Sequence, residues 1–365
     1  MRRVRIDKIA SVTLRLGLDS NAVLGEEIPA EAGTVVAARV LNAKTSYNTL
    51  EDVHGRMVTL HPGDVIAGAL GHRDALYGYS GHVPEKVVVG DELCLLNLGG
   101  VIGAGAQRTP TQGEPFRLEV LGAVLEFPYL GQRIGRPAQI ARAALPSATL
   151  PARGIGLPPI VCLIGTCMDA GKTTAAAVLI GEMTRRGMRV AAGKLTGVSA
   201  RRDVLHMQDC GADPVAVFTD FGVITTNEEN SVAAAHGLVS HLAEHEPDVL
   251  VLEMGDGLLG TYGVHALLSD AALTGAMRSI VLCAQDPVGA WGAKQLLSDR
   301  YGLSVNVISG RVTDGPTGLR YCRDRLETPA WNALRDGKGL AEAVLSTLGS
   351  ESDEPSESRA QEALS

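Results

Sequence analysis

Short, almost entirely apolar runs recur along the C-terminal half of the chain and alternate with segments of helical spacing. The runs lie at residues 160–164, 189–192, 248–252, 279–283 and 304–308. Strands this uniformly apolar are typical of a parallel sheet that helices cover on both faces. One helical segment, 172–186, ends before Gly187, a residue that suits a left-handed helix stop. We therefore predict an α/β domain with a mainly parallel sheet over residues 158–349.

The N-terminal part of the chain has shorter β-type runs, separated by Gly and Asp turns that are too closely spaced for helical crossovers. The predicted strands are 34–41, 64–70, 86–89 and 92–96. This pattern favours a compact β-barrel or sandwich over residues 1–130, which we expect to be an accessory or substrate domain. Residues 131–157 are predicted to form a linker, and the polar, acidic segment 350–365 a disordered tail.

The first apolar run of the C-terminal domain leads into a glycine-rich loop and then into a helix. Backbone N–H groups at such a helix N-terminus form a nest for phosphate oxygens, which the helix dipole also favours. Lys172 is placed to reach the β- and γ-phosphates, and the Thr173 hydroxyl to bind Mg²⁺. The predicted nucleotide-binding residues of this loop are Gly165, Thr166, Cys167, Met168, Asp169, Ala170, Gly171, Lys172, Thr173 and Thr174.

The spacing of this loop departs from the common phosphate-loop pattern, because five residues rather than four separate its two glycines. The form Gly-Thr-x-x-x-x-Gly-Lys-Thr resembles the loop of dethiobiotin synthetase and its relatives. By this resemblance, Lys194 in Gly-Lys-Leu-Thr-Gly is a substrate-side lysine, and Asp203 and Glu253 are ligands of Mg²⁺. The segment 196–221 also resembles a P-loop family that includes amino-acid N-acetyltransferases.

Acidic residues near the strand ends supply the predicted metal site. Glu253 directly follows an apolar run, so its carboxylate is expected in the crevice where open α/β sheets bind ligands. Together with Thr173 and Asp203 it forms the predicted metal-binding set. Three other residues of the same segment remain alternatives to Asp203, namely Asp209, Asp213 and Asp220.

A further pair of polar residues follows the last predicted strand. Thr313 and Asp314 stand where related P-loop proteins place residues that contact the nucleotide base. An ordinary strand-to-helix loop explains them equally well, since this interpretation depends on position alone. We include both residues in the predicted nucleotide site.

Charge and composition narrow the classes of partner. The formal net charge of −8 and a pI near 5.6 argue against nucleic acid, because its binding needs clustered Lys and Arg. No apolar run reaches the ~18 residues of a membrane span, and the N-terminal Met-Arg-Arg-Val-Arg lacks the apolar core of a signal peptide. We therefore expect a cytoplasmic protein that acts on a small molecule and does not associate with membranes.

These features predict a Mg²⁺- and ATP-dependent enzyme of the ligase or kinase type, which activates a small molecule by γ-phosphoryl transfer. The predicted catalytic residues are Lys172, Lys194 and Glu253. Two alternatives remain open: an acyl-CoA-dependent N-acyltransferase whose loop holds the CoA phosphates, and a nucleotide-dependent switch. We expect a homodimer, because small P-loop enzymes often recruit another domain or subunit to enclose the acceptor.

Overall fold

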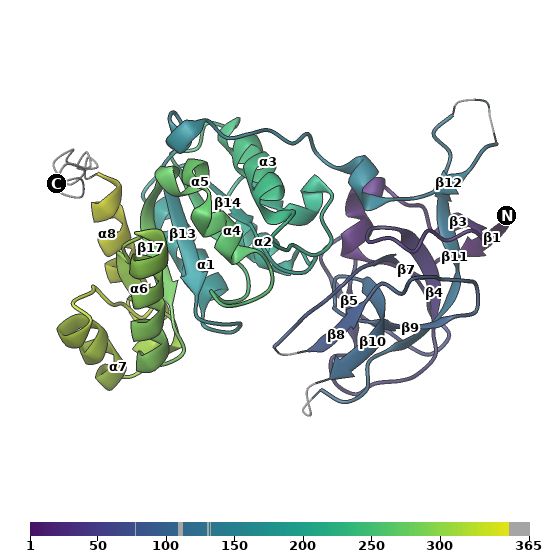
Figure 1. Cartoon of the computed structure of the whole chain (residues 1–365), viewed down its shortest axis with the longest axis horizontal. Helices are drawn as coiled ribbons and strands as arrows, with labels where there is room; N and C mark the ends of the chain where they lie inside the picture. Colours follow the sequence, from purple (N-terminus) through teal and green to yellow (C-terminus); the bar gives the residue numbers. More distant parts are fainter. Residues whose placement is uncertain (77, 109–111, 130, 132, 350–365) are drawn as a thin grey trace, which may run out of the picture.

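A computed structural model of the chain describes residues 1–76, 78–108, 112–129, 131 and 133–349. The chain forms a β-rich N-terminal domain and an α/β C-terminal domain, which lie side by side (Figure 1). The predicted acidic tail, 350–365, lies outside the described residues. No helix within the described residues has the length and apolar character needed to cross a membrane.

The N-terminal domain is built around a closed ring of five strands. The ring strands are β4 (Val35–Val40), β7 (Val65–Leu70), β10 (Val101–Arg108), β9 (Glu92–Leu95) and β11 (Arg117–Glu126). Each pairs with the next in this order, and β11 pairs in turn with β4, so the ring closes. The prediction left barrel and sandwich open, and the pairing of β9 with both β10 and β11 makes this domain a barrel.

Shorter elements extend the barrel at its edges. They are β1 (Arg2–Arg5), β2 (Lys8–Ile9), β3 (Asn21–Gly25), β8 (Tyr79–His82), β12 (Arg136–Pro137) and the hairpin β5 (Thr49–Glu51) with β6 (Met57–Thr59). Three 3₁₀ turns accompany them and the connecting segment: η1 (Ser11–Leu16), η2 (Ile140–Ala143) and η3 (Ala152–Gly154). Apolar positions of the ring strands, together with Leu24 of β3 and Leu50 of β5, fill the interior of the barrel.

Two sequence predictions for this region are corrected. Residues 86–89 form no strand, because Val88 N–H donates to the Asp91 carboxylate in a turn and Val88 and Val89 are 41% and 42% exposed. The barrel also extends past residue 130. The strand β12 pairs with β11, and Ile140 N–H donates to the Gly33 carbonyl, so residues 136–140 belong to the barrel and not to the linker.

The C-terminal domain contains a six-stranded parallel sheet. In spatial order its strands are β15 (Val215–Val217), β14 (Val190–Lys194), β16 (Val249–Glu253), β13 (Ile160–Gly165), β17 (Met277–Cys283) and β18 (Val307–Ser309). All five predicted apolar runs lie in this sheet, although the strand expected at 304–308 begins only at Val307. The strand β15 was not predicted, since three residues are too few for a distinct periodic signal.

Helices cover the sheet on both faces, as the uniformly apolar strands predict. The helices are α1 (Lys172–Arg185), α2 (Arg202–Asp209), α3 (Ser231–Ala243), α4 (Val264–Ser269), α5 (Ala271–Ala276), α6 (Pro287–Tyr301), α7 (Pro316–Arg320) and α8 (Gly337–Leu348). Helix α1 packs between α2 and α8, while α3, α4 and α5 pack in series. Shorter turns are η4 (Phe218–Phe221), η5 (Arg311–Thr313) and the π-turn η6 (Tyr321–Arg325).

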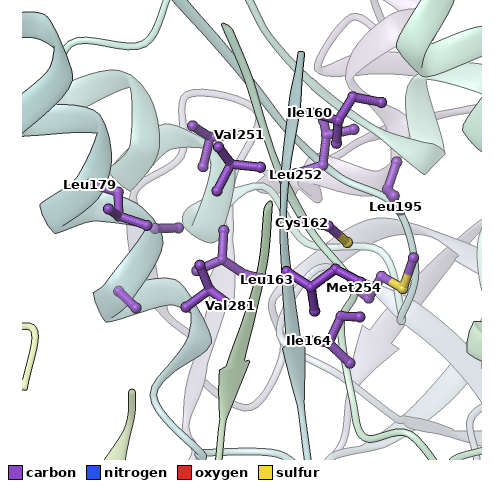
Figure 2. Packing of buried hydrophobic residues seen from close by; sticks show 14 of the residues in the cluster. Ile160, Cys162, Leu163, Ile164, Leu179, Leu195, Val251, Leu252, Met254 and Val281 are labelled. Carbon is purple, nitrogen blue, oxygen red and sulfur yellow. The ribbon is translucent and has the colours of Figure 1, made fainter. Parts of the chain in front are cut away.

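The central strand β13 lies at the middle of the apolar core (Figure 2). Its side chains alternate between the two helical layers, and Ile160, Leu163 and Ile164 are fully buried. Leu179 of α1 packs onto this core from the adjacent helical layer (Figure 2). Burial on both faces fixes β13 and therefore fixes the loop that follows it at the carboxyl edge of the sheet.

The two domains share an ordered interface. Ile224 of the C-terminal domain is 4% exposed and belongs to the apolar core of the barrel. Asn97 Nδ2 of the barrel donates to the Ser199 carbonyl at 2.8 Å, and Thr225 Oγ1 donates to the His72 carbonyl at 2.6 Å. Apolar burial and directional hydrogen bonds therefore hold the barrel in one position over the carboxyl edge of the sheet.

Candidate functional site

The phosphate loop, residues 165–171, connects β13 to α1 at the carboxyl edge of the sheet. Its backbone adopts left-handed conformations at Asp169 (φ 57°) and Gly171 (φ 101°). A Cβ at position 171 would lie 3.0 Å from Gly310 Cα, so glycine allows the loop after β18 to approach. Arg311 Nε donates to the Asp169 carbonyl at 3.0 Å, which holds the two loops together. Strand, loop and helix form a P-loop nucleotide-binding fold.

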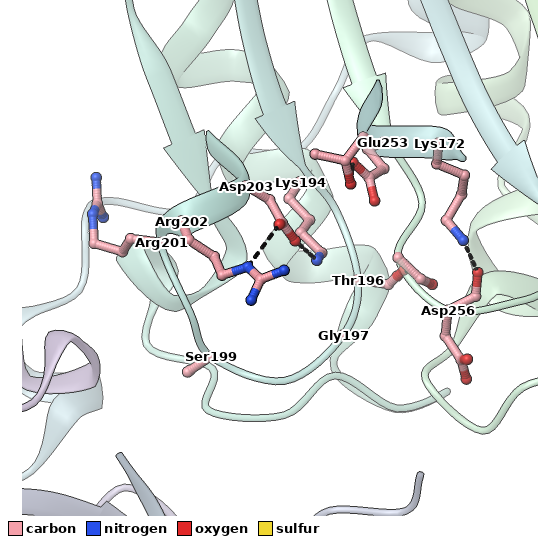
Figure 3. Close-up of polar contacts among 12 residues, drawn as sticks. Lys172, Lys194, Thr196, Gly197, Ser199, Arg201, Arg202, Asp203, Glu253 and Asp256 are labelled. Atoms are coloured by element: carbon pink, nitrogen blue, oxygen red, sulfur yellow. Dashed lines mark hydrogen bonds and ion pairs between the residues drawn. The ribbon is translucent and has the colours of Figure 1, made fainter. Parts of the chain in front are cut away.

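Lys172, the first residue of α1, is enclosed by the loop. Its side chain is 5% exposed, and Nζ donates to the Cys167 carbonyl at 2.8 Å and to the carbonyl of Asp256 (Figure 3). Both partners are neutral carbonyls, so the ammonium charge of Lys172 stays uncompensated by those bonds. A phosphate oxygen placed in the loop would gain a charge-assisted hydrogen bond from it.

Thr173 is paired with the acidic residue at the end of β16. Its Oγ1 donates to Glu253 Oε2 at 3.0 Å, although 80 residues separate them in sequence. Glu253 is 2% exposed, and burial raises the pKa of its carboxyl group despite the opposing charge of Lys194. A carboxylate held in this environment is stabilised by a bound cation, which replaces the lost hydration.

Lys194, at the end of β14, forms an ion pair with Asp203 at the start of α2 (Figure 3). Burial by itself would lower the pKa of Lys194. The negative charges of Asp203 and Glu253 together outweigh burial, so the pKa of Lys194 lies above its usual value. Burial likewise raises the pKa of Asp203, and the ion pair with Lys194 lowers it by more. Both groups are therefore charged at neutral pH, and they lie beside Glu253.

A cavity of about 890 Å³ brings these residues together between the two domains. Residues of the phosphate loop, both lysines and both predicted metal carboxylates line its floor. The barrel forms part of the opposite wall. The lining residues from the barrel are Tyr47, Arg73, Asn97, Leu98 and Gln112. The volume is within the range of small-molecule and cofactor sites.

The structure distinguishes among the four candidate aspartates. Asp203 lines the cavity, whereas Asp209, Asp213 and Asp220 are not among its lining residues. Asp220 is 6% exposed and instead accepts hydrogen bonds from Arg201 Nη1 and from the backbone of Val217. Position at the cavity therefore favours Asp203 as the partner of Glu253.

The two residues predicted to contact a base differ in position. Asp314 lines the cavity, and its Oδ1 accepts a hydrogen bond of 2.9 Å from Asn332 Nδ2. Thr313 is fully buried, and its hydroxyl donates to the Gly310 carbonyl at 2.6 Å. Thr313 is thus engaged within the turn after β18 and is not among the residues that line the cavity.

No protein-family model matches the sequence, and no curated protein matches it. Among solved structures, the signal recognition particle receptor FtsY from Elizabethkingia anophelis is 15% identical, with a TM-score of 0.37 over 53% of this chain and 67% of that one. A DUF1611 family protein from Anabaena variabilis is 17% identical, with a TM-score of 0.39 over 55% of this chain and 61% of that one.

A third solved structure is the signal recognition particle 54 kDa protein from Aeropyrum pernix, in complex with GDP. It is 19% identical, with a TM-score of 0.32 over 53% of this chain and 47% of that one. This chain therefore spans less than two thirds of the Anabaena and Aeropyrum proteins. The P-loop assignment is based on the strand, loop and helix geometry of the chain itself.

Sequence reasoning predicted an accessory or substrate role for the N-terminal domain but identified none of its residues at the cavity. Tyr47, Arg73 and Asn97 carry no motif, and nothing in their local sequence indicates that they face a phosphate loop more than fifty residues away.

Asp256 was also missed by the sequence analysis. Its Oδ1 is buried, with no hydrogen-bond partner among the described residues, and burial raises the pKa of its carboxyl group. The one available signal for Asp256 was the sequence Glu-Met-Gly-Asp-Gly, in which Asp256 closely follows the predicted metal ligand Glu253.

Proposed function

We propose that this protein is a Mg²⁺- and ATP-dependent P-loop enzyme that transfers the γ-phosphoryl group to a small-molecule acceptor. The observation that carries this proposal is the shared cavity. It places a phosphate loop, the Thr173–Glu253 pair and the Lys194–Asp203 ion pair beside a wall from a second domain. A domain that encloses the far side of a phosphate site supports an acceptor-binding role for that domain.

The donor atoms at the floor of the cavity fit Mg²⁺. Thr173 Oγ1 and the carboxylates of Asp203 and Glu253 are all oxygen donors, which Mg²⁺ prefers, and Mg²⁺ sites in nucleotide enzymes use one or two carboxylates with phosphates and water. No group of three or more His, Cys, Asp or Glu residues is arranged as a metal site within the described part of the chain. A site completed by phosphate oxygens agrees with that finding.

The proposed transfer requires few protein groups. An acceptor oxygen attacks the γ-phosphorus, the bond from that atom to the β,γ-bridging oxygen breaks, and its electron pair remains on ADP. Lys172 and the loop N–H groups would stabilise charge on the phosphate oxygens, and Lys194 would orient the acceptor. Mg²⁺, held by Thr173, Asp203 and Glu253, would supply charge neutralisation across the phosphates.

A nucleotide-dependent switch is a second candidate, which three hydrogen bonds between the barrel and one segment support. The segment 195–202 leads from Lys194 at the cavity to α2, and the barrel binds that segment through Glu51 and Asn97. A change in the cavity would therefore reach the barrel directly. A switch would show slow hydrolysis together with large nucleotide-dependent changes in the affinity for a partner.

Mass spectrometry of ligands that copurify with the full chain, followed by turnover assays, tests the proposal. We expect a bound nucleotide and Mg²⁺-dependent formation of a phosphorylated or ligated small molecule from ATP. GTP and acyl-CoA are assayed in parallel. Transfer of an acyl group without nucleotide cleavage, or nucleotide binding with no acceptor-dependent turnover across a metabolite extract, would reject it.

A further inference from the structure

The barrel wall of the cavity carries a single type of charge. Among its described lining residues, Arg73 is the one charged side chain, and the others are polar or apolar. Arg73 is 7% exposed, and its Nη1 donates to the Leu96 carbonyl, which fixes the guanidinium in the wall. Gly78 (φ 126°) leaves room for it, since a Cβ there would lie 2.5 Å from Arg73 Nη2. A buried guanidinium facing a cavity attracts an anionic group.

A strained tyrosine stands in the same wall. Tyr47 has φ 51°, in the left-handed region that residues with a side chain rarely adopt. Its ring packs edge-on against the fully buried ring of Tyr79, with centroids 5.8 Å apart. Such conformations persist where the surrounding structure enforces them, and they are common at binding sites. Separate contacts thus hold Tyr47 and Arg73 in place on the same wall of the cavity.

A chain of neighbours connects Arg73 with the phosphate loop. Tyr262, in the loop before α4, is 4% exposed and lines the same cavity. Burial raises the pKa of Tyr262 to about 12, and Arg73 and Asp256 lie close enough to act on it with opposite sign. The carbonyl of Asp256 accepts a hydrogen bond from Lys172 Nζ. Arg73 and Lys172 thus border the same cavity and are connected through Tyr262 and Asp256.

We propose that Arg73 binds the carboxylate of a small carboxylic acid, the acceptor, in a pocket completed by Tyr47, Asn97 and Gln112. This inference builds on the proposed function and adds the chemical class of its substrate. The planar fork of a guanidinium matches a carboxylate in both shape and charge. One guanidinium fork meets the two oxygens of a single carboxylate, whereas a phosphate ester presents a third oxygen and nearly two negative charges at neutral pH.

A carboxylate acceptor also suits the transfer step. One carboxylate oxygen attacks the γ-phosphorus, the bond to the β,γ-bridging oxygen breaks, and the products are an acyl phosphate and ADP. A carboxylate is already ionised at neutral pH, so no proton has to be removed before attack. The attack therefore leaves the ion pair of Lys194 with Asp203 and the hydrogen bond from Thr173 to Glu253 undisturbed.

The test measures thermal shifts of the full chain saturated with Mg²⁺ and a non-hydrolysable ATP or GTP analogue. The probes are acetate, glutarate, L-alanine and benzoate, each paired with its amide, and glycerol phosphate as a phosphate ester. We expect at least one acid to stabilise the loaded protein while its amide does not. In Arg73→Met the affinity for that acid should fall about tenfold or more, with an unchanged shift from the nucleotide.

Two further variants keep the test decisive. Arg117→Met removes an exposed arginine of the same barrel, paired with Glu92, and should leave acid binding intact. Arg73→Lys retains the charge in case the methionine variant does not fold, and should weaken acid binding less. Equal binding of acids and amides, a preference for the phosphate ester, no stabilising acid, or unaltered affinity in both Arg73 variants would overturn the proposal. A missing nucleotide shift in the parent chain would instead reject the proposed function.

Discussion

The carboxylate of Glu51, in the barrel hairpin, accepts a hydrogen bond of 3.0 Å from the backbone N–H of Arg202, the first residue of α2. A second bond of 2.7 Å comes from Arg201 N–H. Glu51 is fully buried, so its negative charge is placed directly at the positive end of a helix dipole. The next residue along α2 is Asp203, which connects the barrel with the predicted metal site.

Glu51→Gln should therefore weaken both the domain interface and the metal site. An amide retains one acceptor oxygen, so one of the two N–H groups loses its partner, at a cost of about 1–3 kcal/mol in the free energy of unfolding. We expect the Mg²⁺ concentration that half-saturates nucleotide binding to rise. Glu119→Gln, at a half-buried barrel position paired with Arg39, is the control. If the Glu51 variant is destabilised but its Mg²⁺ dependence is unchanged, Glu51 stabilises the domain interface and does not support the metal site.

Lys172→Ala should remove most of the nucleotide affinity with little loss of fold, because the described partners of Nζ are only the carbonyls of Cys167 and Asp256. The expected decrease in affinity is about a hundredfold, measured as the loss of thermal stabilisation by saturating Mg-ATP. Lys338→Ala, at an exposed position of α8, should keep the full shift. The phosphate-loop assignment is wrong if Lys172→Ala is stabilised as much as the parent chain.

Glu253→Gln removes a negative charge from the predicted metal site. The amide oxygen of the glutamine can still accept the hydrogen bond from Thr173 Oγ1. We expect turnover to fall by about a hundredfold or more, and nucleotide affinity to change much less. Titration of Mg²⁺ against initial rate measures the effect. Turnover within a few-fold of the parent would dismiss Glu253 as a ligand.

Asp203→Asn should shift the Mg²⁺ dependence in the same direction as Glu253→Gln, because both carboxylates line the cavity floor. Asp209→Asn, at the exposed end of α2, should have no effect on it. Asp220→Asn should lower stability through the loss of the ion pair with Arg201, yet leave the Mg²⁺ dependence unchanged. A metal defect confined to the Asp220 or Asp209 variant would reassign the second carboxylate.

Asp52 gives a pH-dependent prediction for the barrel hairpin. Its carboxylate accepts hydrogen bonds of 2.9 Å from the backbone of His54 and Arg56 and pairs with Arg56 Nε. Burial raises the pKa of Asp52, but these contacts with Arg56 and His54 lower it by more. The lowered pKa means that its stabilisation is complete above the unfolded value, near 3.9, and is lost as pH falls through the folded value.

The parent chain should consequently exceed Asp52→Asn in the free energy of unfolding by about 1–2 kcal/mol at pH 7. The difference should shrink below about pH 4, where the parent also becomes protonated. Urea unfolding at a series of pH values measures both limits. A difference that grows as the pH falls would contradict the assigned direction.

The amino-acid sequence by itself determined the phosphate loop and most of the parallel sheet. The run 160–164, the loop and α1 are contiguous, so strand burial, glycine positions and helix periodicity act within one short segment and are visible there. The end of α1 near Gly187 and the acidic end of β16 at Glu253 follow from the same local rules. Lys172, Thr173 and Glu253 were identified in this way, and the structure brings them together.

Tertiary structure alone decided which second-domain residues complete the site. Closure of the barrel depends on the pairing of β9 with two partners. The choice of Asp203 over Asp220 depends on the packing that brings α2, and not η4, to the cavity. Asn97 reaches Ser199 across 102 positions, and Glu51 reaches Arg202 across 151. Contacts over such separations leave no periodic or local pattern in either segment, because each partner is selected by the packing of whole domains and not by its neighbours in the chain.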